Sequence, residues 1–168
     1  MYKVKMDGQT LYYPGDKEAV LTNPTLNLQT GYAGTFEFSV PPNNPLYDKI
    51  KNRSSMVSVF RDTTELFYGE VRKQPKVDRY RNKNVYCAGA MSFLADSIQP
   101  QAEYHDMTPR QMLETFLDIH NNQVEDRKKI YLGKVTITDA NDSLYRYTNF
   151  ENTLKAIREK LVEKLGGY

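Results

Sequence analysis

The chain contains no tryptophan, one cysteine and two histidines among its 168 residues. A single cysteine, Cys87, excludes an internal disulfide framework and suits assembly in a reducing cytoplasm. The two histidines have neither His-Glu-x-x-His nor Cys-x-x-Cys spacing, so no motif for a catalytic zinc ion is present. No stretch approaches the roughly 18 apolar residues of a membrane-spanning helix, and the N-terminus lacks the apolar core of a signal peptide. We therefore expect no cofactor and no membrane partner.

The net charge of the chain does not indicate a particular kind of partner either. The 23 Lys and Arg residues nearly balance the 21 Asp and Glu residues, which leaves a formal charge of +2. This balance indicates neither nucleic acid nor a membrane surface as a partner. A hydrophobic content of 39% with 26% charged residues is typical of a globular protein. Thirteen tyrosines and seven phenylalanines favour a β-rich fold, or else interfaces with other proteins.

The first part of the chain predicts an antiparallel sheet. Asp7-Gly8 is a two-residue hairpin signal, because glycine supplies the positive φ that such a turn requires. Further strands are expected at 20–29, 36–40, 56–61, 66–73 and 84–89. The prolines of the Pro41-Pro-Asn-Asn-Pro45 segment cannot donate ladder hydrogen bonds, so the sheet stops there and a rigid crossing with a short helical turn at 46–51 follows. The residues expected to close this unit are Met91, Phe93, Leu94 and Ile98.

Helical spacing begins after Gln99. Thr108, Pro109 and Gln111 form a Thr-x-x-Gln capping box with proline at the first helical position, and the helix is expected to end at 120–122. A strand is predicted at 134–138, a turn at 139–143, and a pairing strand at 145–147. A second helix is expected to start near Asn149 and to stop at Gly166-Gly167. Its apolar stripe comprises Phe150, Leu154, Ile157, Leu161 and Leu165.

These patterns predict an α+β fold with two domains. Residues 1–98 would form an antiparallel β-barrel-like domain, and residues 99–168 a small α+β domain with two helices that is incomplete at its C-terminus.

No set of residues indicates catalysis. His105 and His120 have Glu103, Asp106 and Asp118 nearby in sequence, but no three ligands with converging spacing, so both are expected at a surface or a helix end. There is no Gly-x-Ser-x-Gly motif. The carboxylates that we interpret as strand-edge and turn residues are Asp62, Glu65 and Glu70. We therefore expect no enzymatic activity and no catalytic or metal-binding residues.

Several motifs occur together in a recognisable order. In the first part they are Thr35-Phe-Glu-Phe38, Pro41-Pro-Asn-Asn-Pro-Leu-Tyr47, Glu65-Leu-Phe-Tyr-Gly-Glu-Val71 and Phe93-Leu-Ala-Asp-Ser97. In the second part they are His120-Asn-Asn-Gln-Val124, Leu132-Gly-Lys-Val-Thr136 and Lys164-Leu-Gly-Gly-Tyr168. No single motif is specific, but their order and spacing are. Nearly the whole chain resembles the N-terminal region of the tail minor structural proteins of siphophages, the baseplate hub family also called tail-associated lysin or tail endopeptidase-like.

The resemblance implies a structural component of a bacteriophage or prophage tail tip, assembled in the bacterial cytoplasm. Hub proteins of this family form trimers that close the tail tube. They connect the distal tail protein to fibre or lysin components, with the tape measure protein as a further partner. Family members run on past the Leu-Gly-Gly-Tyr motif, so we expect this chain to be the front of a longer protein. The family's cell-wall hydrolases lie in C-terminal regions absent here, so no catalytic residue is carried over.

One cluster of cations is a candidate interaction surface. Its members are Arg72, Lys73, Lys76, Arg79, Tyr80, Arg81 and Lys83. We favour a solvated hairpin tip whose charges discourage pairing between sheet edges. The alternative is a nucleic-acid-binding OB-like barrel, in which these cations follow phosphates while Tyr80 and Tyr86 stack on bases. An acidic neighbour in a tail assembly is the more expected partner. A third hypothesis, a carbohydrate-binding module, requires exposed tyrosine platforms.

Overall fold

The computed structural model describes residues 1–138 and 145–166 of the chain. Its contacts divide the chain into two compact units, Met1–Ala90 and Met91–Tyr168. The first unit is a curled antiparallel sheet and the second combines helices with a two-stranded sheet, which confirms the predicted α+β class. The division falls just before the segment 91–98, which was predicted to belong to the first domain.

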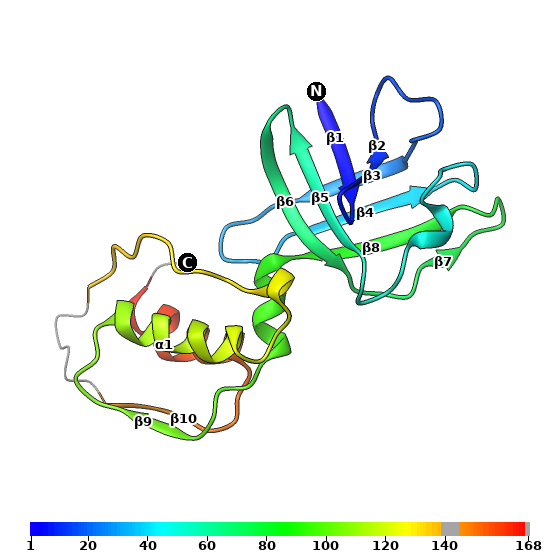
Figure 1. Cartoon of the computed structure of the whole chain (residues 1–168). Coiled ribbons are helices and arrows are strands. Elements are labelled where there is room, and N and C mark those ends of the chain that lie inside the picture. The colour runs from blue at the N-terminus through cyan, green and yellow to red at the C-terminus, as the bar shows by residue number, and fades with distance from the viewer. Residues whose placement is uncertain (139–144, 167–168) are drawn as a thin grey trace. The chain divides into compact units, whose positions relative to one another are not determined.

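The first unit is built on one antiparallel sheet. Its strands are β1 Tyr2–Met6, β2 Gln9–Tyr12, β3 Thr22–Asn27, β4 Thr35–Val40, β5 Met56–Arg61, β6 Thr64–Val71, β7 Lys76–Val77 and β8 Lys83–Gly89. They are ordered β2-β1-β5-β6-β8-β4-β3, and β7 pairs with β8 outside this path. Figure 1 shows the sheet curling from blue β1 to green β8 into a half-barrel.

The local signals predicted most strands of this sheet, but not the short β7, which lies in a stretch expected to be a polar connection. The β1–β2 hairpin turns at Asp7 and Gly8, with φ of 48° and 80°, as a turn with two left-handed residues requires. The predicted strand at 56–61 is confirmed as β5. Because side chains alternate across a strand, Phe36, Phe38 and Val40 all point into the interior, where each is at most 3% exposed.

An apolar core fills the concave side of the sheet. Phe36 contacts Phe38 and Phe67, with ring centroids 4.8 and 6.0 Å apart. Cys87 is fully buried in the same cluster, and burial raises the pKa of its thiol far above the ordinary range. This cysteine is therefore a core residue, with no thiolate available for chemistry.

One glycine permits a very close approach of two backbone segments. A Cβ atom on Gly89, at the end of β8, would lie 1.8 Å from the carbonyl oxygen of Ala33. No side chain fits this space, so glycine is required for β8 to pass the loop that precedes β4.

The buried side-chain amide of Asn44 links the two edge strands of the sheet, β2 and β3. Asn44, in the proline-rich crossing, donates from Nδ2 to the carbonyl oxygens of Leu11 in β2 and of Val20 just before β3, both at 3.0 Å. Its Oδ1 accepts from the Leu46 amide at 3.0 Å, and the 3₁₀ turn Tyr47–Lys49 follows. The crossing thus bridges strand edges that no ladder connects.

The second unit surrounds a long helix. Its elements are the 3₁₀ segment Ala90–Asp96, β9 Ala102–Tyr104, α1 Pro109–Asn121, the 3₁₀ turn Asp126–Lys128, β10 Arg146–Thr148 and α2 Thr153–Ile157. A π turn, Arg158–Val162, and α3 Glu163–Leu165 continue the last helix to Gly166, whose φ is 79°. The predicted capping box is confirmed: Thr108 accepts from the Gln111 amide and Gln111 accepts from the Thr108 amide.

Several predictions for this unit are wrong. Residues 134–138 form no strand, and β10 pairs with β9, placing Arg146 opposite Tyr104. Alternation predicted an extended chain correctly, but it does not specify a pairing partner. The last helix begins at Thr153 with Asn152 as its cap. Phe150, expected in its apolar stripe, is 65% exposed at a φ of 59°.

The segment expected to close the first unit contributes to the second core instead. Leu94 packs there with residues of α1 and of the last helix, while Ile98 is 52% exposed. Tyr104 meets Phe116 edge to face at 5.6 Å. The predicted turn at 139–143 and Gly167 lie outside the described residues.

Candidate functional site

The predicted cationic surface is a hairpin tip. Between β7 and β8 the chain turns around Asp78, whose Oδ1 accepts from the amides of Tyr80 and Asn82 at 2.8 and 2.9 Å. The Asn82 side chain adds a bond to Oδ2 at 3.0 Å, and these bonds lower the pKa of the carboxyl group. Arg81 takes a left-handed φ of 68°. The one acidic residue of the stretch therefore shapes the turn.

Two of the candidate cations are occupied within the fold. Arg72 Nε lies 3.1 Å from a carboxylate oxygen of Glu70, whose side chain is fully buried. This corrects the expectation that Glu70 is a strand-edge residue. Lys83 Nζ donates to the Tyr47 carbonyl at 2.7 Å, forms an ion pair with Asp48 at 3.1 Å, and lies over the Tyr47 ring. Both cations therefore anchor the hairpin.

The remaining candidates face solvent. Lys73 lies 4.2 Å from the centroid of the Tyr86 ring, and Arg79 lies 4.6 Å from that of Tyr80, which is 66% exposed. The exposed set is Lys73, Lys76, Arg79, Tyr80 and Arg81. It is smaller than the predicted surface, and its role in binding stays a prediction.

A buried polar network in the second unit was not predicted. Ser97 Oγ lies 2.7 Å from His120 Nδ1 and 2.7 Å from Thr153 Oγ1, and Gln99 Nε2 donates to Thr153 Oγ1 at 2.8 Å. His120 Nε2 lies 3.2 Å from the Lys128 carbonyl oxygen. That carbonyl only accepts, so Nε2 carries the proton and Nδ1 accepts from Ser97.

The side chains of this network are buried, so a substrate cannot reach them. Ser97, His120 and Thr153 are each at most 1% exposed. Burial lowers the pKa of His120, outweighing its bond to Lys128 and the charge of Asp96, so the imidazole stays neutral. His120 is thus a buried residue at a helix end: the predicted helix-end position is confirmed, and its burial was not predicted. Its partners are too far apart in sequence for any motif to reveal them.

Metal-binding groups were sought in the part of the chain that the structure describes. There, no group of three or more His, Cys, Asp or Glu side chains is placed to hold a metal ion. His105 lies 3.8 Å from Glu103 on the surface and contacts the exposed ring of Tyr145. Within the same residues, none of the helices combines the length and the apolar character needed to cross a bilayer.

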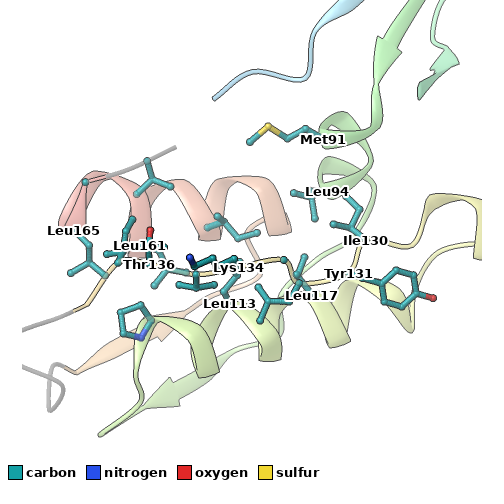
Figure 2. A pocket seen from close by; sticks show the side chains of 18 residues that line it. Met91, Leu94, Leu113, Leu117, Ile130, Tyr131, Lys134, Thr136, Leu161 and Leu165 are labelled. Atoms are coloured by element: carbon teal, nitrogen blue, oxygen red, sulfur yellow. The ribbon is translucent and has the colours of Figure 1, made fainter. Parts of the chain in front are cut away.

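One hollow of the second unit is an apolar groove of about 350 Å³. Figure 2 shows its walls, which come from the 91–94 segment, α1, the last helix and the extended segment 130–137. The apolar side chains that line it include Leu94, Leu113, Leu117, Ile130, Leu161 and Leu165. Among the described residues of the lining, Lys134 is the one that carries a charge. Such a lining suits apolar side chains of a protein partner better than a polar metabolite.

Asn121 positions the extended segment along this groove. Its side chain donates to the Ile130 carbonyl and accepts from the Ile130 amide, both at 2.9 Å. This pair of bonds imitates one step of a β ladder. The segment that follows therefore leaves α1 in an extended direction.

A second exposed feature is aromatic. Tyr145 and Tyr147, which are 50% and 52% exposed, stack with ring centroids 6.1 Å apart. His105 packs against Tyr145, and Lys160 lies over Tyr147 at 4.5 Å. Each ring has a neighbour packed against it and stays about half exposed. The carbohydrate-binding hypothesis, which requires exposed tyrosine platforms, stays a prediction.

The fold is similar to that of tail proteins with solved structures. One is the tail protein from Neisseria meningitidis MC58, with a TM-score of 0.51 and 13% identity over 70% of this chain and 33% of that chain. Another is the 43 kDa tail protein of prophage MuSo2 from Shewanella oneidensis, with a TM-score of 0.52 and 14% identity over 92% of this chain and 46% of that one. The chain thus spans a third to a half of their lengths. No protein-family model and no curated protein matches the chain.

Proposed function

We propose that the chain is a structural subunit of a bacteriophage or prophage tail. The observation that carries the proposal is the fold, which matches the MuSo2 tail protein over 92% of this chain. The motif resemblance of the sequence points the same way independently. The Ser97–His120 pair, which has the composition of a nucleophile and base, is buried and supports the fold.

Within a tail, the subunit fits the baseplate hub at the tail tip best. There a trimer would close the tail tube and connect the distal tail protein to fibre or lysin components, with the tape measure protein in contact. The exposed surfaces suit such assembly: a cationic hairpin tip for acidic neighbours, and an apolar groove. The role is architectural rather than enzymatic.

Binding of nucleic acid is less well supported. Arg72 and Lys83 are occupied by Glu70 and Asp48, so the hairpin offers fewer free cations than its sequence suggests. A protein that tracks a phosphate backbone needs several unpaired cations along one groove.

Mass spectrometry of purified phage particles, induced from the source strain, tests the proposal. Peptides of this chain should co-purify with the tail through a density gradient, at about three copies per particle as a trimeric ring requires. Their absence from intact particles would refute the tail role. A copy number near that of the major tube protein would retain the tail role but exclude the hub.

A further inference from the structure

The exposed face of the β9–β10 ribbon gathers aromatic and hydrogen-bonding side chains around one hollow (Figure 1). Side chains alternate across a strand, so Tyr104 and Arg146 are buried while Glu103 and Tyr147, which pair directly across the ribbon, are exposed. Tyr145, just before β10, lies on the exposed face as well. The hollow over this face has a volume of about 230 Å³. Besides the two tyrosines, its lining includes Gln101, Glu103 and Asn149.

Neighbouring side chains hold the two tyrosine rings in place. The centroid of the Tyr145 ring lies 4.9 Å from that of His105 and 6.1 Å from that of Tyr147, and Lys160 Nζ lies 4.5 Å from the centroid of the Tyr147 ring. Desolvation and a hydrogen bond with Glu103 raise the pKa of the Tyr145 hydroxyl group, so the neutral hydroxyl donates to the carboxylate beside the rings. Rings that are ordered in advance lose little conformational freedom when a ligand binds.

The charges around the hollow favour a neutral ligand. The Glu103 side chain is 67% exposed, and its carboxylate repels phosphate and other anions. Lys160 Nζ lies 3.7 Å from a carboxylate oxygen of Glu151, which offsets its charge. A nucleic-acid strand needs unpaired cations beside the aromatic rings, so it fits poorly. A cationic ligand would compete with the ammonium group of Lys160, which already lies over the Tyr147 ring.

We propose that this hollow binds a neutral saccharide. A sugar ring has an apolar face of C–H groups and an edge of hydroxyl groups. The C–H face packs on a tyrosine ring, which combines an apolar body with a polar end. The hydroxyl groups donate to the Glu103 carboxylate, and the side-chain amides of Gln101 and Asn149 both donate to them and accept from them.

The size of the hollow limits the length of the ligand. Its volume of about 230 Å³ lies below the roughly 300–1,000 Å³ of pockets for drug-sized ligands, so it accommodates a short stretch of sugar residues. The inference rests on the β9–β10 ribbon alone and goes beyond the tail role, which stands or falls separately.

An NMR titration of the isotope-labelled 168-residue chain tests the proposal. The probes are neutral sugars: glucose, galactose, N-acetylglucosamine, maltose, cellobiose and N,N′-diacetylchitobiose. At least one of them should shift the amide signals of 101–105 and 145–149 and saturate in the millimolar range. The amide signals of strands β1–β8 serve as an internal control and should stay in place.

Tyr147 supplies a matched pair of variants. Tyr147→Ala removes the ring and should weaken sugar binding at least about tenfold, whereas Tyr147→Phe keeps the ring and should stay within about threefold of wild type. Tyr80→Ala removes an exposed ring of the first unit and should leave the affinity unchanged. Because Tyr147 is half exposed, its variants should fold, and unchanged signals from the buried residues of α1 would verify this.

Three results would overturn the proposal. One is the absence of shifts at 101–105 and 145–149 with every sugar of the panel. Another is equal affinity of Tyr147→Ala and wild type, because binding would then lie elsewhere. The third comes from two further probes, tetramethylammonium chloride and oligothymidylate: if either shifts these signals while the sugars do not, the site is one for a cation or for nucleic acid.

Discussion

Replacement of Asn44 by alanine removes three hydrogen bonds from the interior of the first unit. The Leu11 and Val20 carbonyl oxygens lose their bonds to Nδ2, and the Leu46 amide loses its acceptor. Asn44 is 3% exposed, so water cannot easily replace the side chain. Each buried backbone group left unsatisfied costs about 1 kcal/mol or more, so the variant should lose about 3 kcal/mol of stability.

Two further variants separate the hydrogen bonds from the loss of side-chain volume. Asn44→Asp keeps the shape and the acceptor for Leu46 but turns an oxygen toward two carbonyl oxygens, so near neutral pH it should be at least as destabilising as alanine. Acidification that protonates the introduced carboxyl group restores one donor and should recover part of the loss. Asn43→Ala changes the exposed neighbour in the same crossing and should stay within about 0.5 kcal/mol of wild type.

Urea unfolding provides the assay, because the thirteen tyrosines give a fluorescence signal and circular dichroism reports the sheet. The order of stability should be wild type equal to Asn43→Ala, then Asn44→Ala, then Asn44→Asp. If Asn44→Ala unfolds within about 0.5 kcal/mol of wild type, the amide bridge between the two ends of the strand order does not hold this unit together.

Three other predictions follow from the same structure. Gly89→Ala should destabilise by about 2–3 kcal/mol, because its Cβ meets the Ala33 carbonyl, while Gly133→Ala, with open space around it, should be neutral in the same melts. Thr108→Ala should cost about 1 kcal/mol through loss of the α1 cap, and an unchanged urea midpoint would contradict the capping role. Burial lowers the folded-state pKa of His120, so the unfolded chain binds more protons below about pH 6.5. Stability should therefore be full above that pH and fall on acidification, and His120→Gln should flatten this slope.

The sequence was sufficient to predict features set by local chemistry. Three such features are the Asp7-Gly8 turn, the inward side chains of Phe36 and Phe38, and the capping box at Thr108. Each depends on residues only a few positions apart, so a short sequence pattern predicts its geometry. The proline-rich segment was predicted to interrupt the sheet, and β4 ends at Val40, just before it. That its Asn44 reaches two distant carbonyl groups was not predictable, because the contact spans strands far apart in sequence.

The errors concern pairing and burial, which local patterns do not determine. The strand at 134–138 has the right alternation but no partner among the described residues, and 145–147 pairs with β9. Glu70 and His120 are polar residues that proved to be buried, each held by groups distant in sequence. Of the predicted cationic surface, the structure brings the exposed members together on one hairpin, whereas Arg72 and Lys83 form ion pairs with Glu70 and Asp48.

Cryo-electron microscopy of the tail tip in intact particles tests the central claim most directly. The account predicts density at the closed end of the tail tube into which copies of the β1–β8 half-barrel fit around the tube axis with threefold symmetry. A tail tip fully explained by other proteins, with no density that accommodates this sheet, would contradict the assignment of the chain as a structural subunit of the tail.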